Sequence, residues 1–140
     1  MEKMENNVQQ TEVWKQYLDT QYEVSNLGNV RNIKTKAVLS QEDTGNGYLC
    51  VGLQIDKGVY KKTRVHRMVA MTFLEFQRTE ERNEVDHING NKSDNSVDNL
   101  RWCTHKENMN NPVTRRKIRR GVKRYRLQLQ NCNCNMVFNF

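Results

Sequence analysis

Hydrophobic and polar positions alternate with a period of two through much of the first half of the chain, which is typical of short antiparallel strands. Residues 22–33, YEVSNLGNVRNI, predict two strands joined by an Asn-Leu-Gly turn. Residues 47–55 and 59–66 predict a hairpin with one buried face, joined by an Asp-Lys-Gly turn. Residues 37–40, AVLS, are a further candidate strand.

The period then changes to that of a helix. In residues 66–76, HRMVAMTFLEF, apolar side chains recur every three or four positions, so we expect one helix after a module of about three to five strands. Residues 85–87 and 101–102 predict a second, shorter hairpin across a long polar loop.

The last third of the chain predicts helices. Thr104 and Glu107 have the spacing of a capping box, so a helix should begin at the residue after Thr104. The Asn-Pro pair that follows either ends this helix or begins another, and apolar positions spaced by three and four favour a helix over residues 112–129. The final segment, 127–140, alternates with a period of two and fits either an edge strand or a tail.

Length and composition limit the chain to one domain or two small modules. It has 140 residues, of which 36% are hydrophobic, and a mean hydropathy of −0.94, so its cores should be thin. It has no apolar run long enough to span a membrane and no secretory signal, so we expect a cytoplasmic protein. We divide it into a disordered N-terminus (1–12), a strand-rich module (13–76), a β-β-α motif (77–111) and a basic helix with a tail (112–140).

The four cysteines do not predict a metal site. Cys50, Cys103, Cys132 and Cys134 form no Cys-x-x-Cys pair, which argues against structural zinc. Cys50 and Cys103 are expected to be small core residues.

The net charge of +7 is concentrated near the C-terminus. Residues 1–114 carry 15 Lys and Arg against all 16 Asp and Glu, whereas residues 115–126, RRKIRRGVKRYR, carry the other eight basic residues and no acid. Such a block is typical of contacts to a phosphate backbone, although a solvated tail has the same composition.

Candidate chemistry lies in the loop and strands of the second hairpin. Asp86 offers a hard carboxylate ligand, His87 a base that titrates near neutrality, and Asn108 a neutral oxygen donor on the capped helix. Asn99 stands at the base of the loop, where its amide can bind backbone groups that fix the His87 ring. These residues permit either phosphodiester hydrolysis with Mg²⁺ or Mn²⁺, or ordinary turn formation by Asn, Asp and Gly.

A resemblance to a known family favours hydrolysis. The order Asp-His, Asn, Asn, with GNK and DNL between them, resembles the HNH nucleases, in particular the HNH homing endonucleases of phages and group I introns. This match runs from Val85 to about Asn111. Upstream, residues 14–31 and 63–73 resemble the strand-rich module that accompanies this subclass. The matches cover roughly 100 of the 140 residues.

The resemblance implies an α+β fold, with a small antiparallel β-rich module and one helix, then a ββα-metal HNH motif and a basic C-terminal helix. It also implies a metal-dependent endonuclease acting on double-stranded DNA as a monomer. By position, His87 would be the general base, Asp86 and Asn108 would bind one divalent ion, Mg²⁺ or Mn²⁺, and Asn99 would be structural. The family leaves 5′-phosphate and 3′-hydroxyl ends, and some members nick only one strand.

The chain departs from some members of the family. The third motif position is Asn108 rather than histidine, and the zinc-binding cysteine pairs of other branches are absent. The tail after Arg126 is short and unlike the extended C-terminal DNA-reading region of larger members.

Basic residues near the motif and in the C-terminal block are the candidate DNA contacts. They are Arg64, Arg67, Arg101, Arg115, Arg116, Lys117, Arg119, Arg120, Lys123, Arg124 and Arg126. His66, beside two of these arginines, fits a phosphate contact or a core histidine equally well, while His105 is expected to be exposed and non-catalytic.

Two other functions are consistent with parts of this pattern. A DNA-binding regulator with a decayed nuclease motif would keep the basic helix, but decay should already have broken one of the four motif residues. An RNA-binding or structural protein would be expected to carry clustered aromatic platforms, which the sequence lacks.

Overall fold

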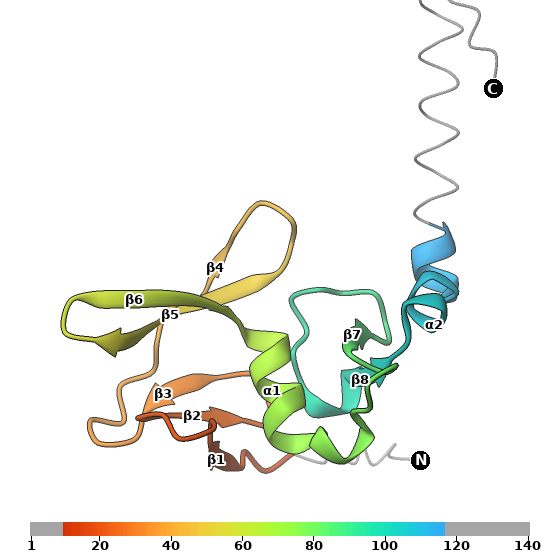
Figure 1. The fold of residues 1–140 in the computed structure, drawn as a ribbon. Helices are drawn as coiled ribbons and strands as arrows, with labels where there is room; N and C mark the ends of the chain where they lie inside the picture. Colours follow the sequence, from red (N-terminus) through yellow and green to blue (C-terminus); the bar gives the residue numbers. More distant parts are fainter. Residues whose placement is uncertain (1–9, 117–140) are drawn as a thin grey trace, which may run out of the picture.

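The computed structural model describes residues 10–116, which form two small antiparallel sheets, a central helix and a β-β-α unit (Figure 1). The first sheet has the strand order β1-β2-β3 and the second β4-β5-β6. The strands are β1 (Trp14–Gln16), β2 (Tyr22–Ser25), β3 (Val30–Asn32), β4 (Glu42–Asp43), β5 (Leu49–Asp56) and β6 (Val59–Arg64). The predicted α+β class is confirmed.

The second half begins with the helix α1 (Val65–Phe73), which follows β6 without a loop. It continues through the 3₁₀ turn η1 (Glu75–Gln77), the strand β7 (Glu84–His87), the 3₁₀ turn η2 (Val97–Asn99), the strand β8 (Leu100–Cys103) and the helix α2 (His105–Met109). The strands β7 and β8 pair antiparallel, as predicted, with Asp86 opposite Arg101.

The turn between β2 and β3 depends on a glycine. Gly28 has φ = +88°, a conformation that side chains with a Cβ rarely adopt. The buried Ser25 hydroxyl accepts hydrogen bonds from the backbone N–H of Leu27 (3.3 Å) and Asn29 (3.1 Å), which closes the turn. The predicted strand-turn-strand is confirmed.

The core forms where α1 meets the sheets and β8. Val65, Met68 and Val69 of α1 are fully buried, and they belong to one cluster with β2, β5 and the Trp102 side chain of β8. Trp102 is 1% exposed and its Nε1–H donates to the Ala70 carbonyl oxygen at 3.3 Å. The helix α1 therefore joins the strand-rich module to the β-β-α unit, as its central place in Figure 1 indicates.

Three details differ from the sequence predictions. Residues 37–40 form only an isolated bridge, Val38 to Arg31, so the predicted strand there is wrong. The helix predicted to reach Phe76 ends at Phe73, because the chain tightens into η1 and leaves Phe76 81% exposed. The short strands β1 and β4 were not predicted, because two or three residues carry too little periodicity.

At the end of the described chain a second helix begins with Pro112. Asn111 precedes it, and its Oδ1 accepts a hydrogen bond from the backbone N–H of Val113 at 3.0 Å, as an N-cap does. Of the two alternatives, the Asn-Pro pair therefore begins a helix. The rest of the predicted helix over 112–129, the segment 127–140 and residues 1–9 lie outside the described residues.

One smaller prediction concerns burial. Cys50 and Cys103 are buried free thiols, as expected, and burial raises the pKa of Cys103 to about 11. In residues 10–116, no helix has the length and apolar character needed to cross a bilayer.

Candidate functional site: a cleft between β7 and α2

Asp86 and His87 lie side by side at the end of β7, and both are 5% exposed. They line a cleft of about 290 Å³, together with Asn108 of α2, Tyr48 and Lys92. The capping box places α2 at this cleft. The Thr104 hydroxyl accepts from the N–H of Glu107 (3.1 Å), and the Glu107 carboxylate accepts from the N–H of Thr104 (2.9 Å). The predicted start of this helix is confirmed.

The Asp86 carboxylate is held by two donors from the protein. Arg101, its partner across the hairpin, donates from Nε to Oδ2 at 3.0 Å, and its Nη2 forms an ion pair with the same oxygen at 2.9 Å. Asn111 donates from Nδ2 to Oδ2 at 2.9 Å and to Oδ1 at 3.2 Å. From residues 10–116, Oδ1 accepts only this one bond, so it keeps lone-pair capacity for a further partner.

The His87 ring is held by an amide and two aromatic rings. Its Nε2 lies 2.8 Å from Oδ1 of Asn95, which is also buried. The ring centroid lies 5.1 Å from that of His66 and 6.1 Å from that of Tyr48. Sequence reasoning missed these neighbours, since Asn95 resembles any other loop asparagine and the other two lie far away in the chain.

His66 is a core histidine and not a surface phosphate contact. It is 4% exposed, and its Nδ1 has no hydrogen-bond partner within the described residues. Burial lowers its pKa to about 3, and the nearby charges of His87, Arg64 and Arg67 act in the same direction. His66 therefore stays neutral and adds no positive charge beside His87.

Asn99 closes the loop between β7 and β8 with hydrogen bonds to other residues of that loop. Its Oδ1 accepts from the backbone N–H of Asn89 (3.0 Å), and its Nδ2 donates to the Asn89 side chain and the Asp94 carbonyl oxygen, both at 2.9 Å. Its own carbonyl oxygen accepts from the N–H of Ile88 (2.8 Å). Asn99 thus contacts the backbone next to His87, while Asn95 contacts the ring.

Asn108 reaches the cleft but does not touch Asp86 directly. Its Nδ2 donates to Glu84 at 2.9 Å, and this bond is the largest cause of the lowered pKa of Glu84. The amide that bonds Asp86 is that of Asn111, which sequence reasoning did not select. An asparagine before a proline that begins a helix indicates an N-cap. It does not indicate a hydrogen bond to Asp86, which lies 25 residues earlier in the chain.

The oxygen atoms of the cleft suit a hard divalent cation. Asp86 Oδ1 has spare acceptor capacity, and Oδ1 of Asn108 makes no hydrogen bond within the described part of the chain. Carboxylate and amide oxygens are ligands of Mg²⁺ and Mn²⁺. Residues 10–116 contain no cluster of three His, Cys, Asp or Glu side chains able to hold a metal. The candidate ligands here are one carboxylate, Asp86, and one amide, Asn108, which do not form such a cluster.

Of the three basic residues predicted near the motif, Arg64 and Arg101 contact residues that line the cleft, whereas Arg67 packs against the core residue Trp102. The Arg64 guanidinium lies 5.1 Å from the Tyr48 ring centroid and that of Arg67 lies 5.6 Å from the ring centroid of Trp102, while Arg101 pairs with Asp86. Arg115 and Arg116 are exposed on the last described helix, and His105, as predicted, is exposed. Lys117, Arg119, Arg120, Lys123, Arg124 and Arg126 lie outside the described residues.

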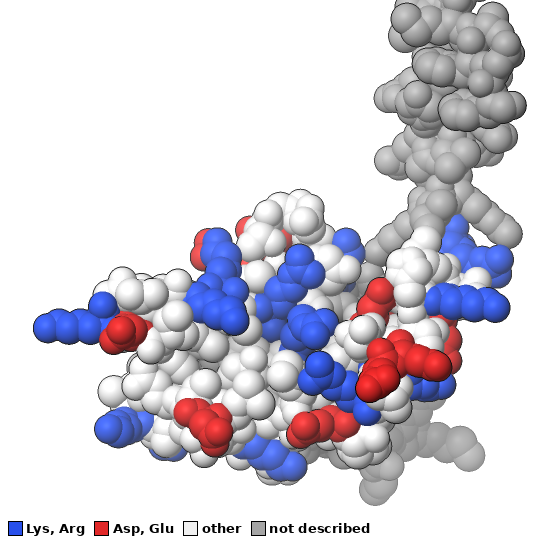
Figure 2. Space-filling model, in the orientation of Figure 1, with Lys and Arg blue, Asp and Glu red and all other residues white. Residues whose placement is uncertain are grey.

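Figure 2 shows how charge is distributed on one face of the molecule. Lys and Arg side chains gather over the β5–β6 hairpin and the start of α1, and again where the described chain ends beyond α2. Acidic side chains gather around β7 and β8.

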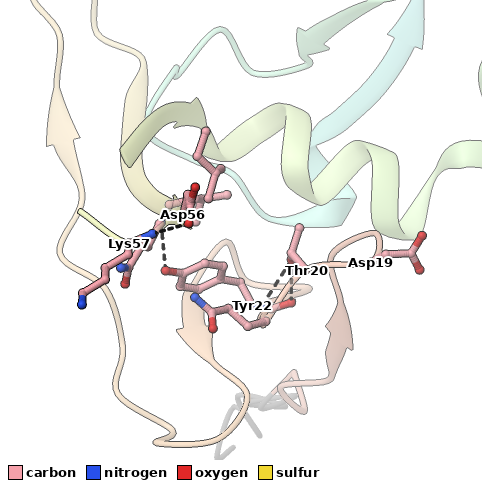
Figure 3. Close-up of a pocket in the computed structure, with 9 residues that line it drawn as sticks. Asp19, Thr20, Tyr22, Asp56 and Lys57 are labelled. Atoms are coloured by element: carbon pink, nitrogen blue, oxygen red, sulfur yellow. Dashed lines mark hydrogen bonds between the residues drawn. The ribbon is translucent and has the colours of Figure 1, made fainter. Parts of the chain in front are cut away.

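A second and larger hollow, of about 580 Å³, lies away from Asp86 and His87 (Figure 3). Two segments line it, 19–22 ahead of and within β2, and 53–57 at the end of β5. The Tyr22 hydroxyl accepts a hydrogen bond from the backbone N–H of Gln54 at 3.0 Å and joins the two segments. The charged residues of its lining are two acids, Asp19 and Asp56, and one lysine, Lys57.

Two family models match the chain. The HNH endonuclease model matches residues 75–110, which contain η1, β7, β8, α2 and the cleft residues Asp86, His87 and Asn108. The NUMOD4 motif matches residues 12–54, which contain the first sheet and most of β4 and β5. The NUMOD4 motif precedes the HNH motif, as the strand-rich module was predicted to precede the β-β-α unit.

Curated relatives and a solved structure agree with these matches. An uncharacterized HNH endonuclease of Acanthamoeba polyphaga mimivirus is 41% identical over 106 residues, which are 74% of this chain and 26% of the viral protein. DNA endonuclease I-HmuI of Bacillus phage SP01 is 43% identical over 94 residues, 67% of this chain and 52% of the phage protein.

A solved structure, described as DNA binding and cleavage by the HNH homing endonuclease I-HmuI, aligns with a TM-score of 0.63 and 39% identity. The alignment covers 74% of this chain and 59% of the solved one. The chain thus spans about half the length of I-HmuI and about a quarter of the viral relative. It belongs to the HNH homing endonucleases related to I-HmuI, with a NUMOD4 module ahead of its HNH motif.

Proposed function

We propose that the protein is a metal-dependent endonuclease that hydrolyses phosphodiester bonds of double-stranded DNA, as a nick or a double-strand break. The observation that carries the proposal is the cleft itself, where Asp86 and His87 are buried side by side and Asn108 faces them from α2. The match to the HNH endonuclease model over the same residues supports it.

In this proposal His87 accepts the proton of the attacking water as general base. Asp86 and Asn108 hold one divalent ion, Mg²⁺ or Mn²⁺, through carboxylate and amide oxygens. When bound, such an ion supplies a positive charge that stabilises the developing negative charge on the phosphate and the leaving oxygen. Arg101 keeps the Asp86 carboxylate in place from the facing strand, and Asn99 keeps the loop closed.

We assign DNA contacts to basic residues on both sides of the cleft. Arg64 and Arg101 contact residues of the cleft, Arg67 lies on α1, and Arg115 and Arg116 begin a basic block whose other members, up to Arg126, would also contact phosphates. The strand-rich module, residues 13–76, would bind DNA beside the cut site, and residues 77–111 would perform the cleavage. The protein would act on DNA as a monomer.

Plasmid cleavage by His87→Ala tests this function. Supercoiled plasmid is incubated with the pure protein in Mg²⁺, in Mn²⁺ and with a chelator, and the breaks are mapped. His87→Ala should lose cleavage while retaining DNA binding, because only the general base is removed. His105→Ala is the matched control, since His105 is exposed and contacts Glu84 and neither Asp86 nor His87.

Two results would contradict the proposal. Cleavage by His87→Ala at more than a few per cent of the parental rate would exclude His87 as the base. DNA binding by the parent protein without nicking in either metal would favour a DNA-binding regulator with an inactive nuclease motif.

A further inference from the structure

The bond between His87 and Asn95 defines which nitrogen of the ring faces the cleft. Nε2 points to Asn95 Oδ1 at 2.8 Å, and both side chains are at least 95% buried. The other ring nitrogen, Nδ1, makes no hydrogen bond with the part of the chain that the structure describes. The ring also lines the cleft that contains Asp86 and Asn108.

The orientation of the Asn95 amide decides whether His87 can act as a base. With Oδ1 toward the ring, Nε2 carries the hydrogen and Nδ1 keeps a lone pair. With the amide reversed, Nδ2–H would donate to Nε2, and Nδ1 would carry the hydrogen and could not accept a proton. Only the first orientation leaves a base on the cleft side of the ring, and it also lets Oδ1 accept from Nε2–H after Nδ1 has taken up a proton.

The position of Asn95 is determined in turn by the NUMOD4 module. Gly28, in the turn between β2 and β3, packs so closely that a Cβ there would lie 2.9 Å from the Asn95 Cβ and 3.1 Å from its carbonyl oxygen. The carbonyl oxygen of Asn26, in the same turn, accepts from the N–H of Val97 at 2.9 Å. The loop that carries Asn95 is therefore held against the N-terminal sheet.

We propose that Asn95 is a positioning residue that holds His87 as its Nε2–H tautomer with Nδ1 toward the cleft, and that the turn around Gly28 supports it. The proposal rests on the proposed function for its catalytic meaning, but the tautomer itself is measured without catalysis. A purely structural Asn95 would close the loop without selecting a tautomer.

Nitrogen-15 NMR of the full chain with labelled histidine reads the tautomer directly. The chain has only three histidines, so His105→Ala and His87→Ala assign the signals. We expect neutral His87 in the parent to carry its hydrogen on Nε2, with a proton signal that exchanges slowly because the bond is buried. Asn95→Leu, similar in size but without an acceptor, should lose that slow signal and populate the other tautomer. Asn95→Asp, which keeps an acceptor, should retain it.

Each outcome supports or overturns the role of Asn95 in selecting the His87 tautomer. A parent His87 with its hydrogen on Nδ1 would overturn the proposal, and so would an unchanged tautomer in Asn95→Leu. An unperturbed His66 signal reports that a variant is folded, since His66 is in the core beside His87. If Asn95→Leu does not fold, the parent tautomer and the Asn95→Asp signal still decide. Asn91→Ala, in the same loop but exposed, is the matched control and should leave the signals unchanged.

Kinetics on plasmid DNA in Mn²⁺ then separates the two proposals. Asn95→Leu should lower kcat about 10²-fold with little change in KM, because the base is misplaced while the DNA contacts remain. A parent that shows the expected tautomer but cleaves no DNA would refute the proposed function and leave the positioning intact. Cleavage by Asn95→Leu at the parental kcat, with its tautomer altered, would refute the positioning role.

The same NMR signal tests the support from Gly28. Gly28→Ala should displace Asn95 and disturb the His87 signals, because the new methyl group has no space. Gly45→Ala is the control, since Gly45 has a similar φ of +97° but nothing within 4 Å of the added Cβ. Equal, unchanged His87 signals in both variants would show that the turn does not support Asn95.

Discussion

At the scale of single residues, the cleft is built from polar side chains that are buried and paired. Asp86 has Arg101 and Asn111, and His87 has Asn95, so each buried polar group next to the proposed chemistry has a specific partner. Because unpaired buried polar groups cost free energy, these partners also limit how far the side chains can move. Among the described residues, Nδ1 of His66 and Nδ2 of Asn95 are the exceptions, since neither has a partner there.

His66 should make stability depend on pH. Its pKa is about 3 in the folded protein and about 6.5 in an unfolded chain. Between these values the unfolded chain binds a proton that the folded protein does not, so the free energy of unfolding falls as pH falls below 6.5. We expect a loss of about 2 kcal/mol from pH 7 to pH 5, because each pKa unit corresponds to about 1.4 kcal/mol.

Denaturant unfolding at several pH values measures this dependence. The window from pH 7 to pH 5 lies above the range in which most carboxylates titrate, which limits their contribution there. His66→Gln should flatten the dependence, whereas His105→Gln, changed at an exposed position, should keep it. An equally steep dependence in His66→Gln would show that another group is responsible.

At the scale of elements, short helices and turns are determined by local hydrogen bonds. The helix α2 has only five residues, so its position depends on the capping box of Thr104 and Glu107 more than on its own length. Glu107 also pairs with Arg82 at 2.9 Å, which ties α2 to the segment before β7. The helix in turn carries Asn108 to the cleft.

Removal of the cap should therefore affect both stability and cleavage. Thr104→Ala should lower the free energy of unfolding by about 1 kcal/mol, a usual value for loss of an N-cap oxygen. It should also raise the concentration of Mn²⁺ needed for half-maximal plasmid nicking, because Asn108 is held less firmly. Thr104→Ser keeps the hydroxyl and should behave like the parent. If Thr104→Ala needs the same Mn²⁺ concentration for half-maximal nicking as the parent, the cap of α2 does not affect the metal site.

At the scale of the whole molecule, the NUMOD4 module and the HNH motif share one core through α1 and Trp102, and they meet again at Gly28 and Asn95. Basic side chains on the face of Figure 2 lie on both modules. In the proposed function, a duplex lying over the cleft would thus contact the hairpin of β5 and β6 on one side and Arg115 and Arg116 on the other.

Salt dependence of DNA binding tests the C-terminal block. If residues 115–126 neutralise four to six phosphates, the logarithm of the binding constant should fall with the logarithm of salt concentration with a slope of roughly −4 to −5. Charge reversal of Arg115, Arg116, Arg119 and Arg120 should make that slope clearly shallower. An unchanged slope, measured by fluorescence anisotropy on the same duplex, would show that the block is a solvated tail.

The sequence by itself determined the features that depend on near neighbours. The turn at Gly28, the β5–β6 hairpin, the capping box of α2 and the adjacency of Asp86 and His87 follow from spacing and from local backbone preferences, and all are present in the structure. Only the tertiary structure decided which asparagine contacts which group. Asn95 and not Asn99 contacts the His87 ring, and Asn111 and not Asn108 bonds Asp86. These pairings depend on how α2 and the N-terminal sheet pack around one loop, and no local rule distinguishes one loop asparagine from the next.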